Sequence, residues 1–444
     1  MREQRTLRVA EPKRASAIAT YLALGFSMMS CADPLEIGTH PVDDRQLSES
    51  QRLVHLQTAF EGDMTIGDML RDIDGLRVKS APRPDTLLRT TAEKDDDRPA
   101  AGGIPLRILV QNVALLDAQI FGFIDYAQTP FLAERRRELP GLYIDAGYDI
   151  LLLQEVWVQE DLERFSQTAQ DSGYAAFAGS RDEYNDGLLT LIKNDLMNTD
   201  VEADFDGVPY QMQDGTEHFP GPGIKRGYHL VRFEHATLGQ ISVFNTHMQP
   251  YASNWKHRMM QARQLGIAID SHVNDNELVF VGGDLNSGPY YAADVWTHPD
   301  GRDEIGWWKN AIAYPLLLEY AELDDLAVMG RSADNATSDI VLGDAIPNLP
   351  EQALETPLGD SAFCEEVPHD TFSATDCNTL YFAQYAGTEP PARLDHLHAR
   401  DPQGRIRVVG STLAFTEMMD FSGVRTEASD HYGVDLQLVI DGDQ

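Results

Sequence analysis

The stretch Asp149-Ile-Leu-Leu-Leu-Gln-Glu-Val-Trp157 contains the pattern from which the fold can be predicted. Its apolar run, residues 150–153, is typical of a strand buried on both faces, and it ends abruptly in Gln154 and Glu155. Other apolar runs end in, or contain, similar polar motifs: Gln111-Asn112, Asn245-Thr246-His247, Gly283-Asp284-Leu285-Asn286, Arg393-Leu394-Asp395-His396 and Ser429-Asp430-His431. Strands of this kind place oxygen and imidazole groups together on one rim of a sheet.

The wider pattern predicts many strands and few helices between them. We predict strands at 106–111, 149–154, 187–193, 228–234, 240–246, 277–283, 393–398, 405–410 and 433–439. The pair 228–234 and 240–246 reads as a hairpin, because only five residues, including Gly239, separate the two runs. The clearest helix is 254–273, with Asn254 as its N-cap, and 310–323 is also helix-like. This arrangement favours two packed sheets flanked by helices over a doubly wound parallel sheet.

Composition changes along the chain predict its division into segments. Residues 1–30 read as an export signal, with a basic start and an apolar stretch at 15–29, and Cys31 follows as in a bacterial lipoprotein. Cleavage with secretion, an uncleaved anchor and a cytosolic start are the alternatives. Residues 31–103 read as an N-terminal segment and an acidic Pro- and Gly-containing linker. We predict the main domain at 104–444, with an insertion at about 287–392.

The charge and the cysteines restrict the possible partners. The chain has 71 acidic and 35 basic residues, a formal net charge of −36. Nucleic-acid binding depends on Lys and Arg that neutralise phosphates, so this charge disfavours a nucleic-acid partner. Cys364 and Cys377 either form a disulfide or remain two thiols, and the disulfide is the favoured interpretation for an exported chain. The oligomeric state is not predicted.

The polar motifs contain the groups that hydrolysis of a phosphate ester needs. Mg²⁺ prefers oxygen ligands, which a Glu, an Asn and an Asp at strand ends supply. A His with a carboxylate partner is the usual general base near neutral pH. The motifs of this chain include both kinds of group.

In their order and residue pattern, the motifs resemble those of the endonuclease/exonuclease/phosphatase superfamily, over roughly residues 104–440. Residues 153–157, 245–249 and 429–434 look most like its neutral sphingomyelinase (sphingomyelinase C) branch. The resemblance implies an α+β fold of the DNase I type, a four-layer α/β/β/α sandwich. In this fold two mostly antiparallel sheets pack face to face between outer helices.

The resemblance also implies a role for each matching residue. Glu155 matches the principal Mg²⁺ ligand, Asn112 an assisting residue of the metal site, and Asp430 an acidic residue near the metal. His431 matches the general base and Asp395 the carboxylate that binds its ring. Three further residues match groups that act on the phosphate: His247, Asp284, which orients the water or protonates the leaving oxygen, and Asn286. Mn²⁺ and Co²⁺ are possible substitutes for Mg²⁺.

The expected activity is divalent-metal-dependent hydrolysis of a phosphodiester, as in a sphingomyelinase C that releases phosphocholine. The expected partners are sphingomyelin or another choline phospholipid, and a membrane surface reached through lipidated Cys31. Secreted bacterial sphingomyelinases carry a long aromatic hairpin before the catalytic His, whereas this chain has only Phe415, Met418, Met419 and Phe421 there. An extracellular nuclease and a catalytically silent binding module on the same fold are the alternatives.

Overall fold

Two six-stranded sheets organise the part of the chain that the computed structural model describes. That part comprises residues 48–54, 103–120, 124–181, 185–213, 224–250, 254–274, 276–288, 313–329 and 394–442. Each sheet is mostly antiparallel and contains a single parallel pair, β1 with β4 in the first sheet and β9 with β10 in the second. The predicted α+β class and the sandwich of two sheets are therefore confirmed.

The first sheet has the strand order β13-β16-β1-β4-β6-β5. Its strands are β1 (Ile104–Asn112), β4 (Ile150–Gln154), β5 (Tyr174–Phe177), β6 (Leu189–Lys193), β13 (Ile406–Ala414) and β16 (Gly433–Ile440). The second sheet has the order β11-β12-β10-β9-β8-β7. Its strands are β7 (Asp204–Pro209), β8 (Gly227–His235), β9 (Gly239–His247), β10 (Leu278–Asp284), β11 (Asp324–Asp325) and β12 (Asp395–Arg400).

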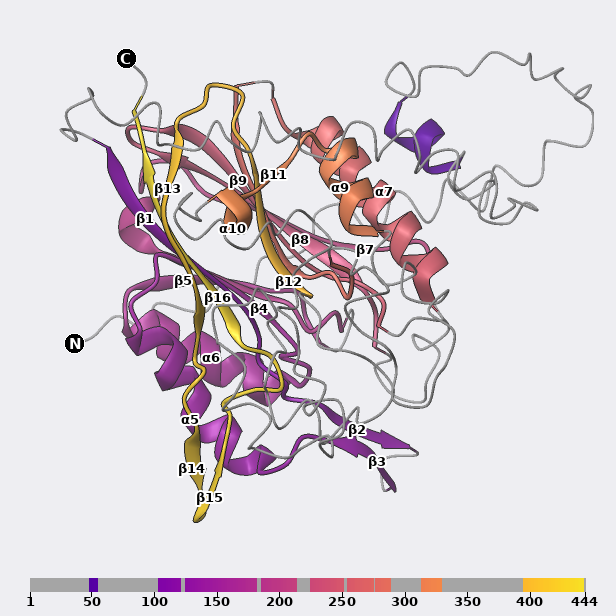
Figure 1. The fold of residues 1–444 in the computed structure, drawn as a ribbon, viewed down its shortest axis with the longest axis vertical. Coiled ribbons are helices and arrows are strands. Elements are labelled where there is room, and N and C mark those ends of the chain that lie inside the picture. The colour runs from indigo at the N-terminus through magenta and orange to yellow at the C-terminus, as the bar shows by residue number, and fades with distance from the viewer. Residues whose placement is uncertain are drawn as a thin grey trace, which may run out of the picture.

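Helices cover the outer face of each sheet. The main helices are α5 (Leu132–Asp145), α6 (Gln159–Asp171), α7 (Trp255–His272) and α9 (Ala313–Tyr320), and α10 (Leu326–Met329) and the 3₁₀ turn η3 (Asn194–Leu196) are short. Figure 1 shows α5 and α6 on one side of the sheets and α7 and α9 on the other. None of the described helices is both long and apolar enough to cross a membrane.

Three apolar clusters hold the four layers together, and β4 shows why. Ile150 and Leu152 point into the cluster between the sheets, while Leu151 and Leu153 point into the cluster under α5 and α6. Successive side chains of a strand alternate between its faces, so an all-apolar run is required where both faces are covered. A third cluster joins α7 and α9 to the outer face of the second sheet.

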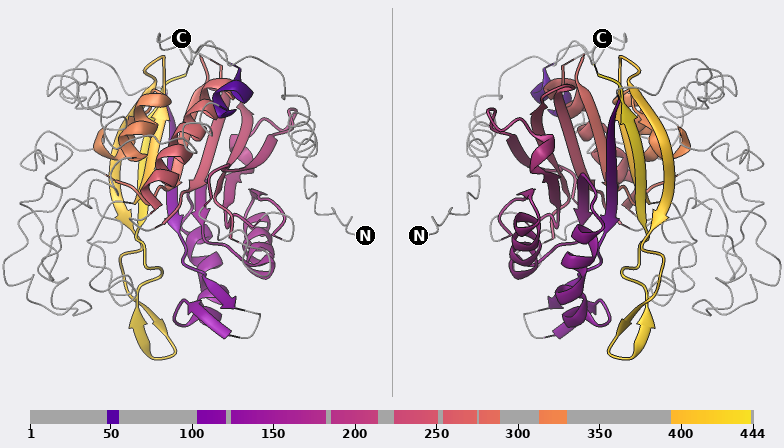
Figure 2. Two further views of the ribbon diagram at one scale, coloured as in Figure 1. Left: turned by 90° about the vertical axis from the view of Figure 1, so that its right-hand side faces the viewer. Right: turned by 90° about the vertical axis from the view of Figure 1, so that its left-hand side faces the viewer.

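Two small hairpins extend from one end of the molecule. They are β2 (Asp117–Ile120) with β3 (Ile124–Gln128), and β14 (Met419–Phe421) with β15 (Val424–Thr426). Figure 2 shows both at the lower end of the molecule. β2 begins shortly after Asn112 and β15 ends shortly before Ser429, so the hairpins flank the rim that carries these polar motifs.

All nine predicted strands are present, with shifts of a few residues at their ends. The predicted hairpin is β8–β9, which is antiparallel. Asn254 occupies the N-cap position of α7, but its side chain makes no capping hydrogen bond. Its Nδ2 donates instead to the carbonyl of Pro250 at 2.9 Å, so Asn254 is the predicted N-cap by position but not through a side-chain bond to the helix.

Candidate active site

The polar motifs meet on one rim of the sandwich because of strand direction and register. In the second sheet, His247, Asp284 and Asp395 occupy one row across β9, β10 and β12. In the first sheet, Asn112 at the end of β1 is level with Gln154 at the end of β4. The carboxyl ends of these strands and the beginnings of β12 and β16 therefore share one edge of the molecule.

His431 and Asp395 form a buried hydrogen-bonded pair on this rim. The Nδ1–H of His431 donates to Oδ2 of Asp395 at 2.6 Å, which leaves Nε2 as the basic nitrogen of the neutral ring. Burial alone would lower the pKa of His431, but the carboxylates of Asp395, Asp430 and Asp284 raise it well above its ordinary value. The ring is therefore oriented and made more basic by its carboxylate neighbours, as a general base requires.

Asp284 faces this imidazole and is held in place from several sides. Its Oδ2 lies 4.0 Å from Nε2 of His431 and 3.3 Å from Nε2 of His247, and it accepts a hydrogen bond of 3.0 Å from Nδ2 of Asn112. Its Oδ1 accepts the backbone N–H of Asn286 at 2.8 Å. Burial would raise the pKa of Asp284, but His247, His431 and the N–H of Asn286 together hold it below its ordinary value. Asp284 is thus an ionised acceptor.

Glu155 stands at a strained turn directly after β4. Its φ of 64° is in the left-handed region, which non-glycine residues rarely adopt. The next residue, Val156, fixes the turn. Its N–H donates to the carbonyl of Gly187 at 2.9 Å, and the carbonyl of Val156 accepts Nε of Arg181 at 2.8 Å. Backbone strain of this kind persists only where surrounding contacts enforce it.

The charges near Glu155 come from the same rim. Burial first, and then the carboxylate of Asp430, raise the pKa of Glu155, while His247, Arg226 and His431 act in the opposite direction. The pKa of Asp430 is likewise raised, by burial and by Asp284. The structure therefore brings Glu155 and His431 together, although they are far apart in the sequence.

Hydrogen bonds below the rim lock the two sheets and the last motif together. Nε2 of Gln154 donates to Oδ1 of Asn245 at 2.8 Å, and Nδ2 of Asn245 donates back to the carbonyl of Leu153 at 3.1 Å, so β4 and β9 are joined across the sandwich. Oγ of Ser429 donates to the carbonyl of Asn112 at 2.6 Å and accepts the N–H of His431 at 3.1 Å. These bonds connect β4 with β9 and the Ser429 motif with the end of β1.

Arg226 is a member of the site that the sequence did not reveal. It is buried, its guanidinium carbon lies 5.2 Å from the centre of the Trp157 ring, and its charge lowers the pKa of both Glu155 and His247. It lies in Lys225-Arg226-Gly227, just before β8, where no polar motif marks it. A buried guanidinium beside this rim can bind a phosphate oxygen.

The sequence matches the Endonuclease/Exonuclease/phosphatase family over residues 126–431, more than half of the chain. The chain belongs to this family. Its members are phosphoester hydrolases that use divalent metal ions, and this chain is a hydrolase of the same general class.

Solved structures of the endonuclease/exonuclease/phosphatase fold are similar at low identity. Truncated TDP2 from Caenorhabditis elegans has 18% identity and a TM-score of 0.46, and the match covers 76% of this chain and 98% of that one. A family protein from Bacteroides thetaiotaomicron has 14% identity and a TM-score of 0.46, with 77% and 99% covered. SmcL has 13% identity and a TM-score of 0.44, with 76% and 99% covered. No curated protein matches the sequence.

The rim residues fit the divalent ion that this family uses. Glu155 and Asp430 offer carboxylate oxygens, the preferred ligands of Mg²⁺, and burial first, and then a neighbouring carboxylate, raises the pKa of each. Asp284, Asp395 and His431 also place three ligand atoms within 4.8 Å of one another. The bond between His431 and Asp395 occupies Nδ1 and leaves Nε2 for proton transfer, so Glu155 and Asp430 are the rim carboxylates that could hold an ion.

Two predicted residues make contacts that the family resemblance did not anticipate. Asn112 donates to Asp284, and its Oδ1 accepts the N–H of Ala114 at 3.0 Å, so it orients the carboxylate of Asp284. Asn286 has a φ of 46° and donates one Nδ2 hydrogen to the carbonyl of Met248 at 3.0 Å. The second hydrogen of that amide is the one that can reach a phosphate.

Other expectations fall on parts of the chain that the structure does not describe. These are Cys31 and the export signal, the linker, most of the insertion, Cys364 and Cys377. The structure likewise leaves the proposed domain boundaries untested.

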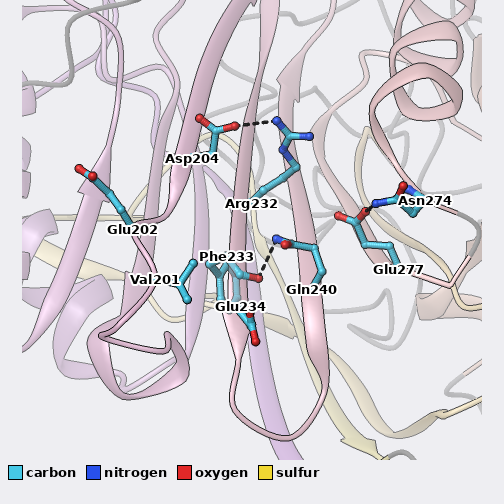
Figure 3. Close-up of a pocket in the computed structure, with 9 residues that line it drawn as sticks. All are labelled: Val201, Glu202, Asp204, Arg232, Phe233, Glu234, Gln240, Asn274 and Glu277. Carbon is cyan, nitrogen blue, oxygen red and sulfur yellow. Dashed lines mark hydrogen bonds and ion pairs between the residues drawn. The ribbon is translucent and has the colours of Figure 1, made fainter.

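A separate small pocket lies at the other ends of the strands. Figure 3 shows its lining, which includes Asp204, Arg232, Gln240 and Glu277. Asp204 and Arg232 form an ion pair of 2.6 Å, and Nε2 of Gln240 donates to the carbonyl of Phe233 at 3.1 Å. None of the residues that line this pocket belongs to the rim described above.

Proposed function

We propose that the chain is a divalent-metal-dependent phosphodiesterase that cleaves a choline phospholipid in the manner of sphingomyelinase C. One observation carries the proposal: the His431–Asp395 pair faces the ionised Asp284 across 4.0 Å, beside the carboxylates of Glu155 and Asp430. This arrangement combines a base, an acceptor for the attacking water and a position for a hard cation.

His431 takes the proton of the attacking water. A water molecule at about 2.8 Å from both Nε2 of His431 and Oδ2 of Asp284 fits the separation of these atoms. Nε2 accepts one proton, Asp395 stabilises the imidazolium at Nδ1, and Asp284 accepts the second hydrogen bond and aims the lone pair at phosphorus. As the water oxygen bonds to phosphorus, the bond from phosphorus to the lipid oxygen breaks. The released lipid oxygen takes a proton from solvent, and the imidazolium of His431 returns its own proton to solvent.

The other rim residues position the reacting groups or neutralise the charge of the phosphate. His247 donates Nε2–H towards Asp284, and burial first, with Arg226, lowers its pKa, so it is a neutral positioning residue. Arg226 and the second amide hydrogen of Asn286 can bind non-bridging oxygens. Glu155 and Asp430 would hold Mg²⁺, which supplies positive charge to the phosphate when it is bound.

The assignment to a choline phospholipid comes from the sphingomyelinase-like wording of the motifs and from the charge. A net charge of −36 opposes binding to the phosphates of a nucleic acid, whereas a zwitterionic headgroup experiences little repulsion. The hairpin before the catalytic His is short, and its Phe421 is fully buried. The guanidinium carbon of Arg135 lies 4.7 Å from the centre of the Phe421 ring. Membrane contact through this hairpin would therefore involve the exposed Met418 and Val424.

The segment before the domain leads us to propose export and anchoring through a lipid on Cys31, with ordinary secretion as the alternative. Metabolic labelling with a radioactive fatty acid should mark the chain, and the Cys31→Ser variant should lose the label. A chain that carries no label would exclude the anchor without affecting the proposed chemistry.

A substrate panel tests the function directly. Purified protein with Mg²⁺ is incubated with sphingomyelin, phosphatidylcholine, plasmid DNA and inositol phosphates, and released phosphocholine, nicked DNA and inorganic phosphate are measured. We expect phosphocholine from a choline lipid, its loss on addition of EDTA, and its return with Mg²⁺, Mn²⁺ or Co²⁺.

Matched variants separate chemistry from folding. Glu155→Gln should require far more Mg²⁺, and His431→Ala should lower the rate by about 10²–10⁴ at every Mg²⁺ concentration. His272→Ala is the control, because His272 is half-exposed on α7 and pairs with Glu49 at 3.5 Å. Cleavage of DNA alone, or no phosphocholine with any of the three ions, would refute the proposed substrate.

A further inference from the structure

A second cluster of metal-ligating side chains lies on the opposite face of β12 from Asp395. His396 and His398 are two residues apart and share a face of this strand, and Asp325 of β11 is directly opposite His398 in the antiparallel register. Asp395, by contrast, is bonded to His431 on the rim. All three residues of the cluster are buried, and Figure 1 shows their strands, β11 and β12, beside α10.

The ligand atoms converge without being hydrogen-bonded to one another. Oδ2 of Asp325 lies 3.9 Å from Nδ1 of His396 and 3.8 Å from Nε2 of His398, and all three ligand atoms are within 4.8 Å of each other. Ligands bound tetrahedrally to Zn²⁺ at about 2.0–2.1 Å are about 3.4 Å apart. Small side-chain rotations would therefore bring these atoms to coordinating distance.

Surrounding hydrogen bonds orient His396 and Asp325 as metal ligands. Nε2–H of His396 donates to the carbonyl of Ser287 at 2.8 Å, so Nδ1 of the neutral ring presents a lone pair. That lone pair faces Oδ2 of Asp325, which is also an acceptor. A metal-bound His typically donates its other N–H to a carbonyl or carboxylate in this manner, which fixes its tautomer.

The carboxylate is fixed in the same way. The hydroxyl of Tyr314 donates to Oδ2 of Asp325 at 2.6 Å, and the N–H of Ala327 donates to its Oδ1 at 3.0 Å. The Tyr314 ring also packs on both imidazoles, with ring centres 4.9 Å from His396 and 5.7 Å from His398. Acceptors that face one another in a buried, pre-oriented cage are stabilised by a cation placed between them.

We propose that Asp325, His396 and His398 bind a zinc-class transition-metal ion, at a site distinct from the catalytic rim. Two imidazoles and one carboxylate suit Zn²⁺, Co²⁺ or Ni²⁺, whereas Mg²⁺ prefers oxygen ligands alone. A water molecule or a further group completes the coordination. The ion ties β11 to β12 and so stabilises the strand whose first residue is Asp395.

The test uses the full chain with the catalytic rim disabled. In the double variant Glu155→Gln/Asp430→Asn, the rim loses both carboxylates that would hold its metal, and binding is measured in excess Mg²⁺. We expect one zinc ion per chain, visible absorption bands when Co²⁺ replaces it, and an X-ray absorption spectrum with two imidazole ligands. At about a hundred times the dissociation constant, Zn²⁺ should raise Tm by on the order of 5 °C.

Further substitutions locate the ion. In the same background, His398→Gln should abolish zinc binding, the cobalt bands and the shift in Tm, whereas His272→Gln should change none of them. If His398→Gln does not fold, the absorption spectrum of the parent variant still decides the question. No bound zinc in excess Mg²⁺, or a coordination shell of oxygen atoms alone, would overturn the proposal.

Discussion

Replacing Asp395 by Asn removes the negative partner of His431 while keeping the shape of the side chain. The two groups are 2.6 Å apart, so their charge centres are about 4 Å apart, an attraction of about 4 kcal/mol at an effective dielectric constant of about 20. At 1.36 kcal/mol per unit, this is about 3 pKa units as an upper limit, and opposite charges typically shift a pKa by about 1–3 units. Asp395→Asn should therefore lower the pKa of His431 by about 1–3 units.

The sign of the effect on activity follows from the role of the base. Only neutral His431 can accept a proton at Nε2, and its pKa in the wild type is raised, so the wild-type rate falls as the pH decreases through that raised value. In Asp395→Asn the same fall should occur at lower pH. The rate on the plateau should also decrease, by about 10²–10⁴, because the Asn amide can donate to Nδ1 as well as accept from it, so the tautomer of the ring is no longer fixed.

The assay is the pH profile of kcat/KM at saturating Mg²⁺, which reports the ionisation of the free enzyme. Asp171→Asn is the control, because Asp171 is exposed at the end of α6, where its Oδ1 accepts Nε2 of Gln167 at 3.0 Å. Its profile should coincide with that of the wild type. An acid limb that stays in place in Asp395→Asn, or moves to higher pH, would refute the assignment of His431 as the base oriented by Asp395.

Two further predictions concern the backbone and the missed arginine. Gly283→Ala should destabilise the fold by at least about 3 kcal/mol in denaturant unfolding, because its φ is 147° and an added Cβ would lie 1.9 Å from the carbonyl oxygen of Thr246. Gly239→Ala, with a φ of 70° but open space around it, should cost only about 1–2 kcal/mol, and equal losses would contradict the steric argument. Arg226→Gln should lower kcat/KM about 10- to 100-fold with the phosphodiester substrate, and Arg226→Lys less, whereas an unchanged value would exclude phosphate contact.

The strands and the rim were predictable because each depends on local sequence. A run such as residues 150–153 must be apolar on both faces to lie between two layers, and a polar residue at its end marks the rim. The nine predicted strands contain apolar residues either in a run or in alternation with polar ones. β7 escaped prediction because it is an edge strand whose residues, Asp204–Pro209, are largely exposed and carry no such run.

The contacts within the site were less predictable, because they join residues from different strands. Sequence spacing gives no sign that Asp284 is the carboxylate beside His247, which depends on the parallel register of β9 and β10. The support of Glu155 was also hidden. Nε of Arg181 binds the turn that follows Glu155, and Nη1 of the same side chain donates to Asp186 at 2.8 Å. Asp186 in turn binds His229 at 2.8 Å. A buried network of this kind has no local signature.

The alternation of side chains along β12 connects the catalytic rim with the proposed second site. Asp395 must hold its carboxylate against His431. It is the first residue of β12, which follows residues 330–393 in the chain, and strand ends fray unless other contacts fix them. β12 has β10 on one side and only the two-residue β11 on the other. An ion that joins Asp325 to His396 and His398 would fix the strand from that weaker side, within one residue of Asp395. A second metal is therefore useful here even without a part in the chemistry, because it would limit the motion of the carboxylate that orients the base.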